Sequence, residues 1–263
     1  MEIKQLVLAQ TLEEAYEAIS SRGATILGGC TWLRMTAKSL EYAVDLSALN
    51  LAYIRENDES LEIGAAATLR SLEVNSLLAK WYGDLFARTT GHIVGLQLRN
   101  LSTLGGSLAG RYGFSDLGTL FLALGARLEL YPKGLIDIED YMAAADHDPN
   151  LIRSVRIPKQ PVPASFQTVR ITRSDFPILN TVVAFTASGW RIAVGARPGR
   201  AQLARSAMRA LGTTQKPTPE RIAEAARLAV EELRFGKDIR ADEAYRKRVC
   251  PVLLRRALEE ASR

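Results

Sequence analysis

The chain has 263 residues, 47% hydrophobic and 24% charged, a composition typical of a globular protein with one to three domains. No apolar run approaches the roughly 18 residues that a membrane span needs, and no signal peptide is visible, so we expect a cytoplasmic protein without a membrane span. The two cysteines, Cys30 and Cys250, are too few for an iron–sulfur cluster or a cysteine-rich zinc site.

The net charge of +5 and the pI of about 9.3 raise the question of nucleic-acid binding. In the basic stretches 197–210 and 244–258, arginines alternate with apolar residues at helical spacing, as on a solvated helix face. Aromatic residues do not interleave with them, so nucleic-acid binding is only a minor alternative. The only histidines, His92 and His147, lie outside any metal-binding pattern, and we predict structural roles for both.

The first half of the chain alternates between predicted helices and strands. Thr11 and Glu14 form a capping box for a helix that ends at Gly23, and Ser115 or Asp116 caps another. In order, the elements are a helix at 11–23, a buried strand at 24–27, a strand with a turn or short helix at 41–49, a strand and helix start at 60–69, helices within 76–96 broken near Gly83 and Gly91, a helix at 115–126, and two strands with a Pro-Gly turn and a helical turn at 126–142.

The second half separates its strands from its helices. Residues 146–166, rich in proline and aspartate, are predicted as the linker between domains. An antiparallel meander follows within 166–198, and then come helices at 202–212, 218–236 and 241–263, the last containing Pro251, which should kink it. The chain is therefore predicted to be α/β (α+β), divided into 1–158 (subdomains of about 1–52 and 53–158) and 159–263.

Two segments share an unusual diglycine pattern. Residues 25–33 read TILGGCTWL and residues 98–110 read LRNLSTLGGSLAG. Both run from an apolar residue through Leu-Gly-Gly and small polar residues to another leucine. A glycine pair is unfavourable inside a helix or a strand, so Gly105 and Gly106 are predicted to lie in neither.

Glycine pairs allow backbone amides to approach an anion closely. Thr31, Thr103 and Ser107 add hydroxyl donors, so two such loops facing each other could hold a pyrophosphate from both sides. Neither segment is a G-x-G-x-x-G motif or a P-loop, and a plain tight turn remains the alternative for each.

With these loops the chain resembles the FAD-binding subunit of molybdenum hydroxylases, the family of the xanthine dehydrogenase and carbon monoxide dehydrogenase flavoproteins. Residues 28–33 resemble its A-G-G-T-D-L loop, and residues 98–107 resemble its I-R-N-x-x-T-I-G-G-N loop. Further similar segments, in chain order, are LEIGAAATL, Ser115-Asp116 with LFLALGA, RITRSDFPILNTVVAF, RIAVGARP and IRADEAYRKRVCPVLLRRAL. The resemblance covers residues from about 24 to 258.

The resemblance implies an FAD-binding domain of two subdomains, of the vanillyl-alcohol-oxidase-like type, and a C-terminal α/β domain with a small antiparallel sheet packed by helices. The residues that it places near FAD are Leu27, Gly28, Gly29, Cys30, Thr31, Trp32, Leu33, Thr103, Gly105, Gly106, Ser107, Asp116, Arg173 and Phe176. The two loops would cradle the pyrophosphate. Asp116 would meet ribityl or ribose hydroxyls, or only cap its helix. Arg173 and Phe176 would lie near the isoalloxazine, or be ordinary core or surface residues.

The resemblance also implies partners. FAD would receive electrons from a two-iron two-sulfur small subunit and pass them to NAD⁺, oxygen or a quinone, and the molybdenum cofactor would belong to a molybdopterin-binding large subunit. No side chain of this chain is predicted to be catalytic, and no metal site is predicted.

Three positions depart from the family pattern. Cys30 replaces a glycine, Trp32 replaces an acidic residue, and Ser107 replaces an asparagine. These departures motivate one alternative, a non-catalytic assembly subunit that has lost FAD. A second alternative is a stand-alone flavin oxidoreductase.

Overall fold

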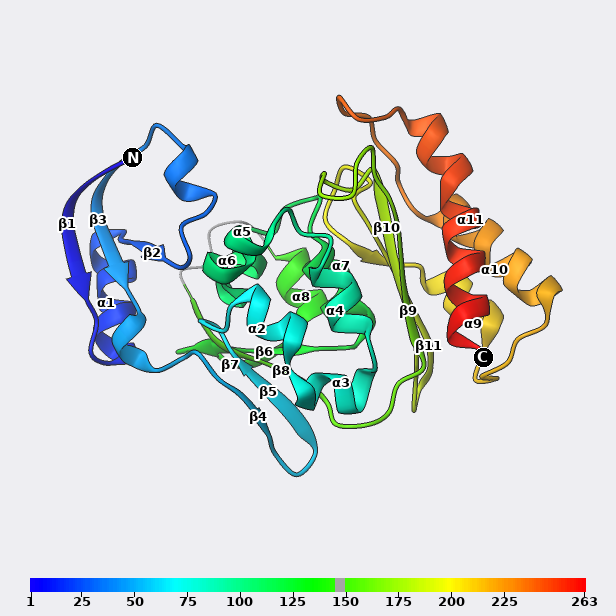
Figure 1. Cartoon of the computed structure of the whole chain (residues 1–263), viewed down its shortest axis with the longest axis horizontal. Helices are drawn as coiled ribbons and strands as arrows, with labels where there is room; N and C mark the ends of the chain where they lie inside the picture. Colours follow the sequence, from blue (N-terminus) through cyan, green and yellow to red (C-terminus); the bar gives the residue numbers. More distant parts are fainter. Residues whose placement is uncertain (145–149) are drawn as a thin grey trace.

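Three β-sheets follow one another along the chain in the computed structural model, which describes residues 1–144 and 150–263 (Figure 1). The N-terminus lies at the end formed by the first sheet, and the C-terminus lies at the opposite end, among the last helices. The predicted α/β (α+β) architecture, with a C-terminal antiparallel sheet packed by helices, is confirmed.

The first sheet is parallel, with the strand order β1-β3-β2. Its elements are β1 (Glu2–Leu8), α1 (Leu12–Arg22), β2 (Thr25–Leu27), the 3-10 turn η1 (Leu33–Met35), β3 (Ser39–Asp45) and the 3-10 turn η2 (Ser47–Leu49). The predicted cap of α1 is present, since the Glu14 amide donates to Thr11 Oγ1 (3.2 Å) and Gly23 ends the helix with φ +62°. The sequence did not predict β1, because most of its side chains are exposed and show no apolar alternation.

The second sheet is antiparallel, with the order β4-β5-β8-β6-β7. Its strands are β4 (Ile54–Glu56), β5 (Ser60–Gly64), β6 (Arg127–Tyr131), β7 (Gly134–Asp137) and β8 (Leu151–Pro158). The helices that lie between these strands in the chain are α2 (Leu69–Val74), α3 (Ser76–Tyr82), α4 (Leu85–Thr90), α5 (Leu96–Leu101), α6 (Leu104–Ala109), α7 (Asp116–Ala123) and α8 (Ile138–Ala143).

The linker predicted at 146–166 is wrong over residues 151–158, which form the middle strand β8. Leu151, Val155 and Ile157 are almost fully buried there, and the pairing of β8 with β5 and β6 outweighs the proline content of its surroundings. The N-terminal side of that predicted linker, with His147, lies outside the described residues.

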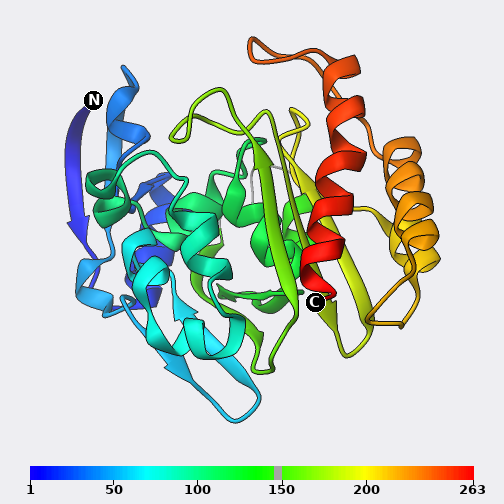
Figure 2. The same ribbon diagram turned by 45° about the vertical axis from the view of Figure 1, so that its right-hand side comes forward.

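The third sheet is antiparallel, with the order β12-β11-β10-β9, and it lies between two layers of helices (Figures 1 and 2). Its elements are β9 (Ala164–Val169), β10 (Leu179–Thr186), β11 (Gly189–Gly195), β12 (Gln202–Leu203), α9 (Arg205–Leu211), α10 (Pro219–Glu232) and α11 (Glu243–Ala261). On β10, Val183 faces the core under α9–α11, whereas Val182 and Ala184 face the core shared with α7. Burial on both faces explains the continuous apolar run of β10.

Two ion pairs join the helices of the second sheet to the third sheet and its covering helix. Arg88 on α4 pairs with Glu260 on α11, whose carboxylate also accepts hydrogen bonds from Ser165 and Gln167 on β9. The second pair, Asp116 with Arg170, is almost completely buried. The third sheet is thus held to the part of the chain that precedes it by polar contacts as well as by the shared core.

A buried arginine organises the loop before α11. Arg246 is fully buried and donates to the carbonyl oxygens of Ile178 (2.9 Å) and Gly236 (3.0 Å) and to Asp238 Oδ1 (2.6 Å). Burial by itself would raise the pKa of Asp238. The hydrogen bonds from Arg246 and from the loop amides outweigh burial and lower that pKa to about 2.

We predict that Asp238→Asn lowers the free energy of unfolding by about 2 kcal/mol at pH 7, because a lowered native pKa is a stabilisation of the ionised form. This contribution is complete above the ordinary pKa of an aspartate and is lost as the pH falls toward about 2. Urea denaturation at several pH values should therefore show the difference between the two proteins shrinking below about pH 4. A difference that stays constant between pH 7 and pH 3 would contradict this account.

Candidate functional site

A cavity of about 490 Å³ lies between the first sheet, helix α6 and strand β8. It is lined by residues 25–33, 45–47, 65–66, 101–103, 105–107 and 150–152, with Ala109, Gly110 and Tyr112. One cavity therefore brings together all the predicted residues of the two glycine loops. They are Leu27 to Leu33, Thr103, Gly105, Gly106 and Ser107.

The glycines permit the two loops to touch through their backbones. A β-carbon on Gly29 would lie 1.7 Å from the Leu101 carbonyl oxygen, and one on Gly28 would lie 2.8 Å from Thr103 Oγ1. Gly105 packs similarly, since a β-carbon there would lie 2.8 Å from Cβ of Ala65. A side chain at any of these positions would push apart segments that form the cavity wall.

Gly106 has a different environment. Thr103 Oγ1, at 3.1 Å, would be the one neighbouring atom within 4 Å of a β-carbon at this position. Because Gly106 lines the cavity, the space that its missing side chain leaves is available to a ligand.

The prediction that Gly105 and Gly106 lie outside a helix is wrong, because both belong to the first turn of α6. Amides in a first turn have no partner within the helix, so other acceptors are needed. The Gly105 amide donates to the Ala65 carbonyl (2.8 Å), and the Gly106 amide donates to Thr103 Oγ1 (3.3 Å). These contacts and the close packing on Ala65 offset the low helix propensity of glycine.

The first loop presents backbone amides that the protein itself does not use. Within residues 1–144 and 150–263, the N–H groups of Gly29, Cys30, Thr31 and Trp32 donate to no protein acceptor. Cys30 has φ +54°, in the left-handed region, where a residue with a β-carbon is strained by roughly 1–2 kcal/mol. Successive amides in such a turn form a concave site for an anion.

The thiol of Cys30 is neutral at ordinary pH. Burial, and then the nearby charge of Asp45, raise its pKa above the usual range. Its Sγ atom donates to the Gly28 carbonyl (3.4 Å). The thiol therefore adds no negative charge beside the unpaired amides.

Hydroxyl groups tie the two loops together. Thr31 Oγ1 and Ser102 Oγ lie 2.9 Å apart. The Ser107 hydroxyl donates to the Thr103 carbonyl (2.8 Å), so it faces a ligand as an acceptor. Ser102 lines the cavity although the sequence did not predict it, and its place directly before Thr103 was the available signal.

Four aromatic rings, Trp32, Tyr112, Phe114 and Phe176, form what we call the aromatic cluster. The ring centroids of Trp32 and Tyr112 are 5.2 Å apart, and those of Phe114 and Phe176 are 4.2 Å apart. Trp32 and Tyr112 also line the cavity. Trp32 is 45% exposed, so it offers an aromatic surface at this site where the family pattern has an acid. No sequence pattern indicated that Tyr112 and Phe114 would join it.

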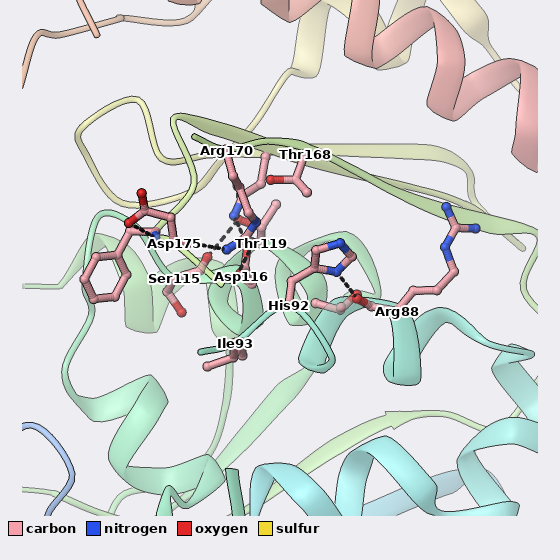
Figure 3. A network of polar contacts seen from close by, with 12 residues as sticks. Arg88, His92, Ile93, Ser115, Asp116, Thr119, Thr168, Arg170 and Asp175 are labelled. Atoms are coloured by element: carbon pink, nitrogen blue, oxygen red, sulfur yellow. Dashed lines mark hydrogen bonds and ion pairs between the residues drawn. The ribbon is translucent and has the colours of Figure 1, made fainter. Parts of the chain in front are cut away.

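The three predicted residues beyond the loops do not line the cavity. Phe176 does not line the cavity itself, but its ring contacts Trp32, which does. Arg173 is exposed on the loop between β9 and β10. The helix cap is Ser115, whose Oγ accepts from the Gly118 amide (3.0 Å). Asp116 is buried and accepts a hydrogen bond from Arg170 (2.6 Å) (Figure 3). It accepts a second one from Asn180 (2.7 Å). Burial raises the pKa of Asp116, and Arg170 and Asn180 oppose that rise.

The described part of the chain offers few other side chains that could act in catalysis or bind a metal ion. His92 packs against Phe166 and contacts the Arg88 carbonyl through Nδ1 (2.7 Å), away from the cavity. No group of three or more His, Cys, Asp or Glu residues that could hold a metal ion occurs among the described residues. None of the helices described there has the length and apolar character needed to cross a membrane.

Two family models match the chain in succession. The first, described as the FAD binding domain in molybdopterin dehydrogenase, matches residues 2–160. The second, described as the CO dehydrogenase flavoprotein C-terminal domain, matches residues 164–261.

Individual relatives and solved structures agree with these matches. The chain is 27% identical to the nicotine 6-hydroxylase medium subunit of Paenarthrobacter nicotinovorans, over 95% of this chain and 94% of that protein. Carbon monoxide dehydrogenase from Hydrogenophaga pseudoflava is similar in fold, with TM-score 0.89, 22% identity, and coverage of 98% of this chain and 96% of that one. Quinoline 2-oxidoreductase from Pseudomonas putida 86 gives a TM-score of 0.87 at 23% identity, with coverage of 98% and 96%.

We predict that Gly29→Ala lowers the free energy of unfolding by about 2 kcal/mol or more, because the new methyl group would overlap the Leu101 carbonyl. Thermal unfolding of the purified chain measures this loss. Gly199→Ala is the matched control, since a β-carbon there meets nothing within 4 Å. Equal melting temperatures for the two variants would show that the loops do not need this close approach.

Proposed function

Because this chain belongs to the FAD-binding family of molybdopterin dehydrogenases, we propose that it is the flavoprotein subunit of a molybdenum hydroxylase complex. The resemblance seen in the sequence is confirmed by the matches to both family models, and FAD is the cofactor of the family. In the proposed complex, a two-iron two-sulfur small subunit supplies electrons, a molybdopterin-binding large subunit carries out substrate oxidation, and NAD or another acceptor receives the electrons. The name medium subunit, given to the relative from Paenarthrobacter nicotinovorans, supports such a three-part arrangement.

The observation that carries the proposal is the set of unused amides in the first loop. Gly29, Cys30 and Thr31 would hold the pyrophosphate of FAD through N–H groups that lack protein acceptors in the described structure. Gly106 would leave room for it on the opposite wall. The residues of the two glycine loops thus fit a dianionic group, and their cavity has the size of an ordinary cofactor site.

Trp32 and Tyr112 line the same cavity and offer aromatic faces to the flavin ring system. FAD supplies the redox chemistry of the complex when it is bound, and this chain's residues bind and orient it. The proposal therefore assigns no catalytic side chain, and it describes a xanthine dehydrogenase-like oxidoreductase subunit.

The same proposal includes the domain division of the sequence analysis, 1–158 and 159–263, with subdomains of about 1–52 and 53–158. The separation of the five-stranded sheet from the four-stranded sheet supports it. A cytoplasmic location is part of the proposal as well.

The purified chain should show the visible absorption of a flavin, and the flavin released on denaturation should be FAD. If the chain is colourless, added FAD should restore the absorption. A chain that stays colourless in excess FAD would favour the non-catalytic assembly subunit. Turnover by the isolated chain, without partner subunits, would favour a stand-alone flavin oxidoreductase.

We predict that Gly106→Val weakens FAD binding by about tenfold or more, because the added side chain occupies space in the cavity rather than in the protein core. Titration with FAD, followed by flavin fluorescence, measures the affinity. The melting temperature without FAD serves as the control for folding and should change little. A folded variant with unchanged affinity would rule out the pyrophosphate assignment at this loop.

A further inference from the structure

The loop between β9 and β10, residues 170–178, touches the aromatic cluster without lining the cavity. Its base is closed by a hydrogen bond from the Ile178 amide to the Val169 carbonyl (2.9 Å). Near its C-terminal end the loop carries Phe176, whose ring centroid lies 4.2 Å from that of Phe114 and 6.3 Å from that of Trp32. The loop therefore supports, from behind, a ring that faces the cavity.

A buried ion pair anchors this loop to the FAD-binding part. Asp116 at the start of α7 and Arg170 directly after β9 point toward one another, with Oδ2 and Nη2 2.6 Å apart (Figure 3). Their side chains are only 4% and 5% exposed. In such surroundings the loss of one partner leaves an uncompensated buried charge, which is strongly destabilising locally.

A second set of contacts fixes the carboxylate of Asp116. Asn180 Nδ2 donates to Asp116 Oδ1 (2.7 Å), and Thr119 Oγ1 donates to Asn180 Oδ1 (2.9 Å). Gly195 on β11 permits this arrangement, because a β-carbon there would lie 2.1 Å from Thr119 Oγ1. The orientation of the carboxylate is thus set by α7, β10 and β11 together.

Arg170 extends this anchoring to the C-terminal end of the loop. Its Nη1 donates to the Asp175 carbonyl oxygen (2.6 Å), one residue before Phe176. The Asp175 carboxylate in turn accepts from the Phe176 amide (3.0 Å). A continuous series of contacts therefore runs from Asp116 through Arg170 and Asp175 to Phe176, and from there to Trp32.

We propose that Asp116 is a positioning residue for the FAD cavity: through Arg170 it holds Phe176 in place, and Phe176 holds Trp32 at the cavity wall. This inference rests on the proposed function, since it concerns how the chain shapes its FAD site. This role acts through Arg170 and requires no direct contact between Asp116 and the ribityl or ribose hydroxyls. Each carboxylate oxygen already accepts one hydrogen bond, Oδ2 from Arg170 and Oδ1 from Asn180.

The Arg88–Glu260 pair provides a matched comparison. It joins the same two parts of the molecule, but both of its side chains are 34% exposed. None of its hydrogen-bond partners belongs to the aromatic cluster or to the cavity. Its loss should weaken the attachment between the two parts without changing the surroundings of Trp32.

The experiment follows Trp32 in the full chain by fluorine NMR after labelling with 5-fluorotryptophan, with Trp32→Phe assigning its resonance among the three tryptophans. Without FAD, Asp116→Asn and Arg170→Gln should each shift the Trp32 resonance, whereas Glu260→Gln should leave it in place. Asp116→Asn and Arg170→Gln should each weaken the binding of FAD by about tenfold or more. The double variant should have the same affinity for FAD as the single variant that binds FAD less tightly, because both substitutions break the same series of contacts.

Other outcomes overturn the inference. Weaker FAD binding by Asp116→Asn with an unmoved Trp32 resonance would indicate direct contact between Asp116 and FAD. Effects no larger than those of Glu260→Gln would indicate a purely structural ion pair. If Asp116→Asn does not fold, Phe176→Leu tests the far end of the series, and normal FAD binding with an unmoved Trp32 resonance would refute it. If the unmodified chain binds no FAD, the proposed function fails, and the Trp32 resonance still decides whether Asp116 positions the cluster.

Discussion

The carbonyl oxygen of Leu101 occupies almost the place where a β-carbon of residue 29 would stand, and much of the site depends on that contact. Because Gly29 has no side chain, the loop after β2 can lie against the segment between α5 and α6. This approach brings the small parallel sheet against the rest of the FAD-binding part and closes one side of the cavity. It also leaves the amides of Gly29 to Trp32 without protein acceptors in the described structure, which makes the cavity suitable for an anion.

The departures from the family pattern take on physical meaning in this setting. Cys30 accepts a left-handed conformation that glycine would adopt without strain, and its thiol stays neutral beside the unpaired amides. Ser107 directs its hydroxyl hydrogen into the Thr103 carbonyl, so the donors left free at the cavity are backbone amides rather than this side chain. Where the family pattern has an acidic residue, this chain has Trp32, whose ring packs on Tyr112 and Phe114. The chain thus forms the cavity with an aromatic wall. Positions 30, 32 and 107 add no negative charge to it, although Asp45 belongs to the lining.

The C-terminal sheet contributes to this cavity from a distance. Its strand β10 is buried on both faces, so the sheet shares one core with α7 and another with α9–α11. The buried Asp116–Arg170 pair crosses the first of these interfaces and ends, through Asp175, at the aromatic cluster. A domain without any residue lining the cavity can thereby influence the shape of its wall.

The sequence by itself determined the features that depend on neighbours within a few residues. The Thr11 cap, the β9–β11 meander and the two diglycine loops follow from local hydrogen bonding and side-chain period. Only the tertiary structure decided that β8 is a central strand, that Gly105 and Gly106 open a helix, and that Tyr112 and Phe114 pack on Trp32. It also decided that Asp116 meets Arg170 and Asn180, 54 and 64 residues further along the chain. Such contacts are fixed by the packing of whole sheets against one another, which no local pattern of residues encodes.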